Sequence, residues 1–345
     1  MDLTKPLRVI DHSDLSPIEK ARARALAKSY GHQWSTFDGK FVAAELDLAV
    51  KLKDTDGWTL GGTIDTLCKR KGKYVMIEHK TRTGDVHNTS DGYYRSLAHN
   101  TQITLYCILL GGYEYEMEQT IYDVVRKIGS AKRRVPAGTA KDPDSIKQGT
   151  CQEIEQHGTY HGMLCDGKEL VRLANYNQLK AEKKHCGPFQ ESDELYEHRI
   201  TVDVAENADR FYKQYGQIHR SYEQMGGFVE TLKQICRQID SIDHDNENCW
   251  AQNTSQCNSY GTSCEYMDIC SDRDDLASDN FQDRKGGSTS GDRVLSHSKM
   301  TCYLSCPRKY FYRYIKKREH SRIKPPALKF GQVFHEFLAE FWQDR

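Results

Sequence analysis

The pattern of apolar and polar positions predicts alternating helices and strands in the first third of the chain. Ser16 is a typical helix N-cap and Pro17 a typical first helical residue, so a helix is expected from there to Gly31. Segments rich in β-branched and aromatic residues then predict three strands joined by short turns, at 41–52, 57–70 and 73–81. Together these segments predict a β-meander.

A further helix and strand are expected after the meander. Residues 94–110 place apolar side chains at helical intervals and end before Gly111, and residues 119–128 are β-branched and aromatic. The order of elements indicates an α/β fold with a mixed central β-sheet flanked by helices. Residues 205–240 are predicted to be helical, whereas the polar stretch 131–195 yields no prediction.

Composition excludes several classes of protein. Only 37% of the 345 residues are hydrophobic, and no apolar run approaches the roughly 20 residues that cross a bilayer. The first residues lack the apolar segment of a secretory signal, so a cytoplasmic location without a membrane partner is expected.

Lys plus Arg and Asp plus Glu both number 49, so contacts with nucleic acid must come from local basic patches. Twelve cysteines in a reducing compartment favour metal or cluster ligation over disulfides.

Two carboxylates and a lysine are expected to converge at the end of the meander. Asp65 closes the segment GGTID, and Glu78 and Lys80 follow an apolar run. Residues i and i+2 of a strand share a face, so these two point the same way while His79 points opposite. A hairpin around Gly72 would bring Asp65 beside Glu78. Such oxygen ligands suit Mg²⁺ or Mn²⁺, although the pattern alone also fits solvated charges on a strand edge.

The flanking residues extend this pattern into a resemblance. GGTID, the strand ending in Glu-His-Lys, and the Q-x3-Y pair of Gln102 and Tyr106 together resemble the PD-(D/E)XK nuclease superfamily, in particular its RecB-like branch. The two members of the Q-x3-Y pair share a helix face. The resemblance implies a restriction-endonuclease-like fold. The catalytic residues that it implies are Asp65, Glu78, Lys80, Gln102 and Tyr106. It also implies that Asp65 and Glu78 bind the metal ion, with Glu45 in a supporting role.

Cysteines gather at short spacings after residue 248. Soft thiolates at such spacings suit zinc or an iron–sulfur cluster. The C-x6-C-x5-C pattern is similar to the C-terminal staple of iron–sulfur members of the same branch, such as AddB-type helicase-nucleases and CRISPR-associated exonucleases. In these, the fourth cysteine lies in a C-P-R-x-[YF] motif, which here is CPRKY. The resemblance implies a [4Fe-4S] cluster, with Zn²⁺ as the alternative, held by Cys257, Cys264, Cys270 and Cys306. Cys249, which is nearer in sequence, is the rival fourth ligand.

The order of the motifs departs from the family. There, CPRKY and a G-x3-H helix precede the nuclease core, whereas here both follow it. The resemblance implies that His335, four residues after Gly331, reaches the carboxylates as a metal ligand or phosphate contact. The chain would be a circular permutant, the beginning of a truncated second module, or an artefact of how the reading frame was drawn. Residues 294–345 are too few to fold easily alone, which favours completion of the core within this chain.

Four parts of the chain are therefore expected. The acidic and then Gly/Ser-rich composition after the cysteines is typical of a linker. The parts are a nuclease core at 1–248, a cysteine-rich cluster segment at 249–270, a flexible linker at 271–293, and a permuted segment at 294–345 that completes the core.

The leading hypothesis is a metal-dependent nuclease that hydrolyses DNA, expected to be an exonuclease in DNA repair, recombination or phage DNA processing. Basic residues of RRV, VVRK and CPRKYFYRYIKKR would follow the phosphates of single-stranded DNA or of DNA with free ends. The interleaved tyrosines fit either base stacking or a core helix. The sequence contains no Walker A motif, so unwinding would need a helicase partner. The alternative is a catalytically inactive DNA-binding or scaffold subunit, against which the intact acidic and lysine residues argue.

Overall fold

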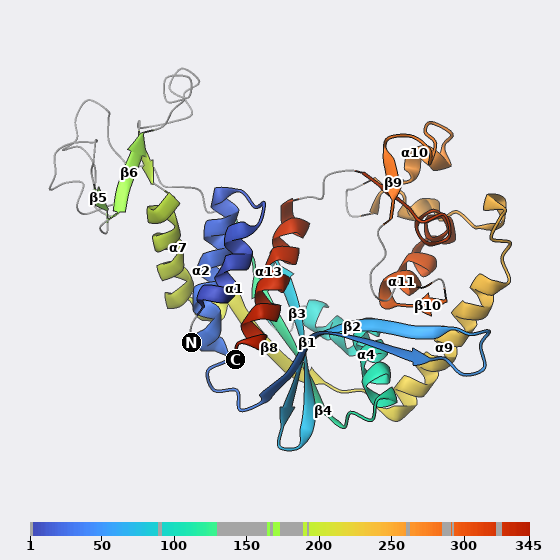
Figure 1. Ribbon diagram of the computed structural model, residues 1–345, viewed down its shortest axis with the longest axis horizontal. Helices are drawn as coiled ribbons and strands as arrows, with labels where there is room; N and C mark the ends of the chain where they lie inside the picture. Colours follow the sequence, from blue (N-terminus) through green and yellow to red (C-terminus); the bar gives the residue numbers. More distant parts are fainter. Residues whose placement is uncertain are drawn as a thin grey trace.

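The structure is a computed structural model. It describes residues 3–88, 92–129, 164–165, 168–172, 189–191, 193–259, 263–284, 291, 293–321 and 326–345. A mixed β-sheet forms the centre, and helices cover both of its faces (Figure 1). The predicted α/β class is confirmed.

The central sheet has the strand order β1-β2-β3-β4-β8, with β10 beside β2. Its strands are β1 (Lys40–Lys51), β2 (Thr59–Arg70), β3 (Lys73–Arg82), β4 (Met117–Arg126), β8 (Tyr212–Ile218) and β10 (Val294–Leu295). The first three form the predicted antiparallel meander, and β3 then pairs in parallel with β4. The helical prediction for 205–240 is wrong over β8, because these residues pair with β4 and tertiary pairing outweighs the local pattern.

One face of the sheet is covered by helices from both ends of the chain and by one from its middle. They are α1 (Thr4–His12), α2 (Pro17–Gln33), α7 (Asp193–Glu206) and α13 (Pro326–Gln343). The predicted cap of α2 is present, because the Ser16 side chain accepts a hydrogen bond from the Glu19 backbone. Val75 and Ile77 of β3 pack into this core. Figure 1 shows the two chain ends side by side, where the Lys5 ammonium contacts Asp344 at 3.2 Å.

The other face carries helices from the middle and the C-terminal part. They are α4 (Thr101–Gly112), α9 (Tyr222–Asp240) and α11 (His297–Ser305). Met76 packs on this side, so successive residues of β3 enter opposite cores. The helix expected at 94–110 is confirmed over α4 but is not continuous, since α3 (Gly92–Ser96) and a 3₁₀ turn precede α4. The chain bends at Asn100, whose side chain caps α4 by accepting a hydrogen bond from the Ile103 backbone.

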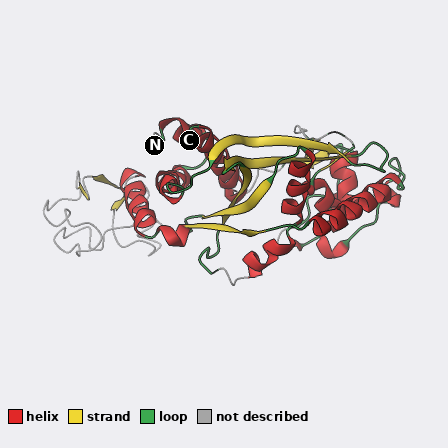
Figure 2. Ribbon diagram, turned by 90° about the horizontal axis from the view of Figure 1, so that it is seen from below, coloured by secondary structure: helices red, strands yellow, loops and turns green. Residues whose placement is uncertain are grey.

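Short elements surround the cysteines at one end of the sheet. They are 3₁₀ turns at Glu247–Cys249 and Thr254–Gln256, α10 (Met267–Cys270), β9 (Phe281–Asp283), α12 (Pro307–Tyr310), a π-helical turn at Phe311–Ile315, and β11 (Arg318–His320). Figure 2 shows that the helices of this part gather at the end of the strands away from the chain termini.

Two expectations for this part need correction. The range 271–293, expected as a flexible linker, contains β9, which pairs with β11 and buries Phe281 against the Tyr266 ring. Tyr310 and Tyr312 are fully buried, so they form core packing and not stacking surfaces for bases.

Smaller elements complete the description. They are α8 (Ala208–Phe211) and a separate antiparallel sheet of β5 (Leu164–Cys165), β6 (Lys168–Arg172) and β7 (Phe189–Glu191). The basic RRV segment lies outside the described residues. Within the part of the chain that the structure describes, no helix is long and apolar enough to cross a membrane.

Candidate active site

Three side chains from separate elements come together beside the sheet. Glu45 on β1, Asp65 on β2 and His335 on α13 each place a ligand atom within 4.8 Å of the others. Asp65 Oδ2 accepts a hydrogen bond from the backbone N–H of His79 at 2.8 Å and lies 3.9 Å from His335 Nδ1. The structure thus brings the carboxylates of the meander together with the histidine from the far end of the chain.

The backbone at Glu45 is unusual for a strand residue. Its φ of 49° lies in the left-handed region, which non-glycine residues adopt rarely and at an energetic cost. Burial, and then the negative charge of Asp65, raise the pKa of the Glu45 carboxyl. The negative charges of the two carboxylates repel each other, and a bound cation would offset this repulsion.

Glu78 is not one of this group of three, and it is fully buried on β3. Its Oε1 accepts a hydrogen bond from Lys80 Nζ at 2.5 Å, whereas its buried Oε2 has no partner among the described residues. Burial, and then the charge of Asp65, raise the pKa of Glu78 to about 7. A buried carboxylate oxygen without a donor favours a ligand at this position.

The predicted lysine, glutamine and tyrosine form one chain of contacts. Lys80 Nζ also donates to Gln102 Oε1 at 3.3 Å, and Gln102 Nε2 donates to the Tyr106 hydroxyl at 2.9 Å. Burial lowers the pKa of Lys80, but the charges of Glu78 and Asp65 outweigh it and raise the pKa overall. Lys80 therefore carries a positive charge at neutral pH.

Two glycines allow helices to approach these residues. A Cβ on Gly62, within GGTID, would lie 2.8 Å from Tyr106 Cε1 and 3.0 Å from Leu109 Cδ1. A Cβ on Gly331, within the G-x3-H motif, would lie 3.3 Å from Thr81 Oγ1 on β3. Both motif glycines therefore set the distance between a helix and the sheet.

A buried polar network lies behind the site and was missed from the sequence. His79 points to the opposite face, as predicted, and its Nδ1 lies 2.8 Å from Asp123 Oδ2. The Tyr30 hydroxyl donates to the same oxygen at 2.5 Å. Burial lowers the pKa of His79, but Asp123 outweighs it and the pKa is raised. The available signal was the lone acid in the apolar run QTIYDVVR, since a buried acid requires partners.

The four predicted cluster cysteines share one cavity. Cys257, Cys264, Cys270 and Cys306 line a space of about 190 Å³, whereas Cys249 is exposed and does not line it. Among the described residues, three ligand atoms of His, Cys, Asp or Glu lie within 4.8 Å of one another in the group of Glu45, Asp65 and His335, and in no group of cysteines. No three of the four sulfurs therefore lie that close to one another.

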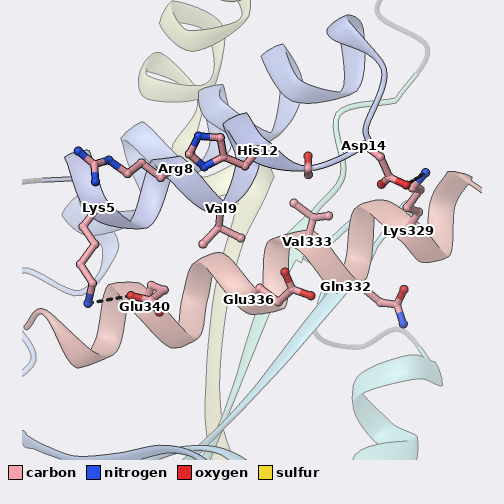
Figure 3. A pocket seen from close by; sticks show the side chains of 11 residues that line it. Lys5, Arg8, Val9, His12, Asp14, Lys329, Gln332, Val333, Glu336 and Glu340 are labelled. Atoms are coloured by element: carbon pink, nitrogen blue, oxygen red, sulfur yellow. Dashed lines mark ion pairs between the residues drawn. The ribbon is translucent and has the colours of Figure 1, made fainter. Parts of the chain in front are cut away.

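A larger groove lies between α1 and α13 (Figure 3). Its volume is about 800 Å³, and Val9 and Val333 face each other across it. Its lysines already have acidic partners, since Lys5 pairs with Glu340 at 2.8 Å and Lys329 pairs with Asp14. The carboxylates of the meander do not line this groove, so it is separate from the candidate site.

Comparison with known families agrees with the motifs. The sequence model described as the PD-(D/E)XK nuclease superfamily matches residues 6–271 and 294–345, which include the meander, the cysteines and the C-terminal motifs. No curated protein and no solved structure matches the chain.

Proposed function

The chain belongs to the PD-(D/E)XK nuclease superfamily, and from this premise we propose that it cleaves DNA at the site built by Asp65, Glu78 and Lys80. The superfamily consists of metal-dependent nucleases, so the chain is a nuclease of the hydrolase class. DNA as the substrate and exonuclease action are parts of the proposal. The observation that carries the site assignment is the ion pair of the buried Glu78 with Lys80, beside the group of Glu45, Asp65 and His335.

The donors at the site fit Mg²⁺ or Mn²⁺. Asp65, Glu78 and Glu45 offer carboxylate oxygens and His335 offers an imidazole nitrogen, and the unpartnered Glu78 Oε2 leaves a free lone pair. When bound, the dication would lower the pKa of water and offset negative charge on the scissile phosphate. These four residues are the ligands that we propose.

Besides the metal ion, the site has a positive charge of its own, which Lys80 supplies. Its ammonium is held between Glu78 and Gln102, where it can orient the attacking water and stabilise negative charge on the phosphate. Tyr106 holds the Gln102 amide, so the Q-x3-Y pair positions the lysine. The negative charge of Glu78 raises the pKa of Lys80 and so keeps the lysine protonated.

For the cysteine cavity we propose a [4Fe-4S] cluster, with zinc as the alternative. Four thiols in one cavity satisfy the ligand count of either group. Zinc–sulfur bonds of about 2.3 Å place the four sulfurs of a tetrahedral site about 3.8 Å apart. No three of these sulfurs lie within 4.8 Å of one another, and this separation favours the larger cluster.

The proposed substrate is single-stranded DNA or DNA with free ends. Support comes from the half-buried Tyr314 ring, which Arg284 and Arg313 approach at 4.7 and 6.0 Å from its centre. Cations around an aromatic ring suit a phosphate backbone with stacked bases. A separate helicase would supply unwinding in repair, recombination or phage DNA processing. An inactive DNA-binding or scaffold subunit is the alternative, which the complete set of Glu78, Lys80 and Gln102 disfavours.

The test is a cleavage assay on end-labelled single-stranded and duplex DNA with Mg²⁺, Mn²⁺, Ca²⁺ or EDTA. Wild-type protein should cleave with Mg²⁺ or Mn²⁺, bind without cleavage in Ca²⁺, and lose activity in EDTA. Glu78→Ala and Lys80→Ala should each lower cleavage by at least about 100-fold while DNA binding persists. Lys73→Ala is the matched control, because Lys73 lies on the same strand and forms an exposed ion pair with Glu116.

Two outcomes would refute the proposal. Cleavage that persists in EDTA excludes the metal-dependent mechanism. Cleavage at the wild-type rate in both Glu78→Ala and Lys80→Ala excludes this site. Binding of DNA without cleavage under any of the metal conditions would favour the inactive scaffold.

A further inference from the structure

Helix α11 reaches from the candidate active site to the cysteine cavity. It begins at His297, has nine residues, and ends at Ser305 with Cys306 as its C-terminal cap. At 1.5 Å per residue it is about 13.5 Å long. Its first residue contacts α4, and the residue after its last turn lines the cavity. One rigid element therefore touches both regions.

The contact at the first end is specific. His297 Nε2 lies 3.1 Å from Thr101 Oγ1, and Thr101 is the first residue of α4. Burial, and then the charge of Lys80, lower the pKa of His297, so the ring is neutral at neutral pH. The influence of Lys80 also shows that the ring lies within electrostatic reach of the catalytic lysine.

Thr101 is one residue away from the group that holds the lysine. Gln102 accepts from Lys80 Nζ and donates to the Tyr106 hydroxyl. A rotation of the first turn of α4 would therefore move Gln102 and loosen the lysine. His297 brings a side chain of the C-terminal segment within hydrogen-bond distance of this turn.

A second clamp holds the same turn. Arg220 donates to the carbonyl oxygens of Leu97 and Asn100 at 2.9 and 3.1 Å, and to Thr104 Oγ1 at 2.8 Å. Loss of His297 should therefore disturb the turn without unfolding it. This predicts a partial and measurable effect on the reaction.

We propose that His297 is a positioning residue of the nuclease reaction, which orients Gln102 and Lys80 through Thr101. His297 is itself held in place by α11, whose other end is fixed where Cys306 lines the cysteine cavity. The inference rests on the proposed function, because that function gives Lys80 its catalytic role. His297 belongs to none of the sequence motifs described above. A contact from His297 to the substrate phosphate is the competing interpretation.

The first experiment measures steady-state cleavage in Mg²⁺ for His297→Ala, His297→Gln and Thr101→Val. His297→Ala should lower kcat about tenfold with KM within about twofold, since small displacements of a catalytic group are costly. His297→Gln should restore most of kcat, because its amide group can donate or accept a hydrogen bond in place of Nε2. Thr101→Val should match His297→Ala, and the double variant should lose no more. Ser298→Ala, next in α11 and without a side-chain hydrogen bond in the described residues, is the control.

The outcomes separate the alternatives. A rise in KM with unchanged kcat indicates a substrate contact and overturns the proposal, as do additive losses in the double variant or full activity of His297→Ala. If wild-type protein is inactive with Mg²⁺ and Mn²⁺, the proposed function fails instead. If wild-type protein is active, Lys80→Ala is inactive and His297→Ala cleaves at the wild-type rate, the positioning role is refuted while the proposed function stands.

The second experiment measures hydrogen exchange of the amides at 97–104, which does not depend on activity. Exchange there should be faster in His297→Ala than in wild type. Cys306→Ser should have the same effect, whereas Cys249→Ser should not, and Cys306→Ser should add nothing in the His297→Ala background. Unchanged exchange at 97–104 in a folded Cys306→Ser protein overturns the link through α11.

Discussion

Single residues at the site show how burial and charge act against each other. Glu78 is fully buried, and burial together with Asp65 raises its pKa to about 7. Lys80 offsets part of this cost through a 2.5 Å contact to one oxygen, while the other oxygen stays unpartnered within the described chain. A cation bound at that oxygen would favour the ionised acid, so metal binding should release a proton. The burial of Glu78 therefore favours binding of a cation and does not by itself stabilise the fold.

Gly62 provides a test of the packing that places the Q-x3-Y pair. Gly62→Ala would put a Cβ 2.8 Å from the Tyr106 ring, closer than real contacts allow. We expect the free energy of unfolding to fall by about 1–3 kcal/mol, as for other overpacked cores, and cleavage to fall because Gln102 is displaced. Urea denaturation and the cleavage assay measure the two effects.

Gly111→Ala on α4, the helix that carries Tyr106, is the control for Gly62→Ala. A Cβ there meets nothing within 4 Å, so this change should be neutral or stabilise the protein by up to about 1 kcal/mol. Equal stability of the Gly62→Ala and wild-type proteins would contradict the close approach of α4.

At the scale of elements, the sequence correctly predicted those helices and strands that local sequence patterns determine. The capping signals of Ser16 and Pro17 and the alternation along the meander identified α2 and the first three strands. The strand β8 was mistaken for a helix, because its pairing with β4 is a long-range interaction that local periodicity does not report. The bend at Asn100 was missed because an N-cap inside an apolar run is a weak signal.

The site was predictable where motifs and strand geometry agree. Glu78 and Lys80 share a face because strand residues alternate, and this required only the correct assignment of β3. Tyr30 and Asp123 come from elements far apart in sequence, so no spacing rule joins them to His79. Long-range contacts of this kind need the tertiary structure.

The cysteine cavity leads to a prediction about the elements α10 and α11. Cys306→Ser should remove the broad absorbance near about 400 nm expected of a [4Fe-4S] cluster and lower the melting temperature, because the cysteine joins the two elements. Cys249→Ser should do neither, since Cys249 is exposed outside the cavity. Absorbance spectra, iron and zinc analysis of anaerobically purified protein, and thermal melts measure these effects. Loss of the chromophore in Cys249→Ser but not in Cys306→Ser, or zinc without iron, would contradict it.

At the scale of the whole molecule, the last 52 residues belong to both faces of the sheet. Tyr303 and Tyr310 are buried with the α4 side, whereas Phe334 and Trp342 are buried with α1 and α2 on the other side. Trp342 packs edge-on against Trp34 with ring centres 4.8 Å apart. The C-terminal segment therefore packs on both faces of the sheet, as expected if it completes the core.

This arrangement predicts that the order of the segments can be exchanged. The chain ends lie together, where Lys5 contacts Asp344. A permutant that joins residue 345 to residue 3 through a short Gly/Ser linker, and that begins at residue 293, would have the motif order of the family. Because folds with adjacent ends tolerate permutation at surface connections, we expect cleavage within about threefold of wild type and a melting temperature within about 5 °C.

The control for the permutant isolates the effect of the new connection. Wild-type protein with the same linker inserted between Arg284 and Arg293 tests whether a change at that point is tolerated by itself. If the insertion protein folds and cleaves DNA while the permutant does neither, the C-terminal segment is not the displaced first part of this core. If both are active, the packing of α11 and α13 on the two faces is sufficient to define the fold, and the position of their motifs along the chain has no effect on the site. The packing of both helices against the same sheet makes this second outcome the expected one.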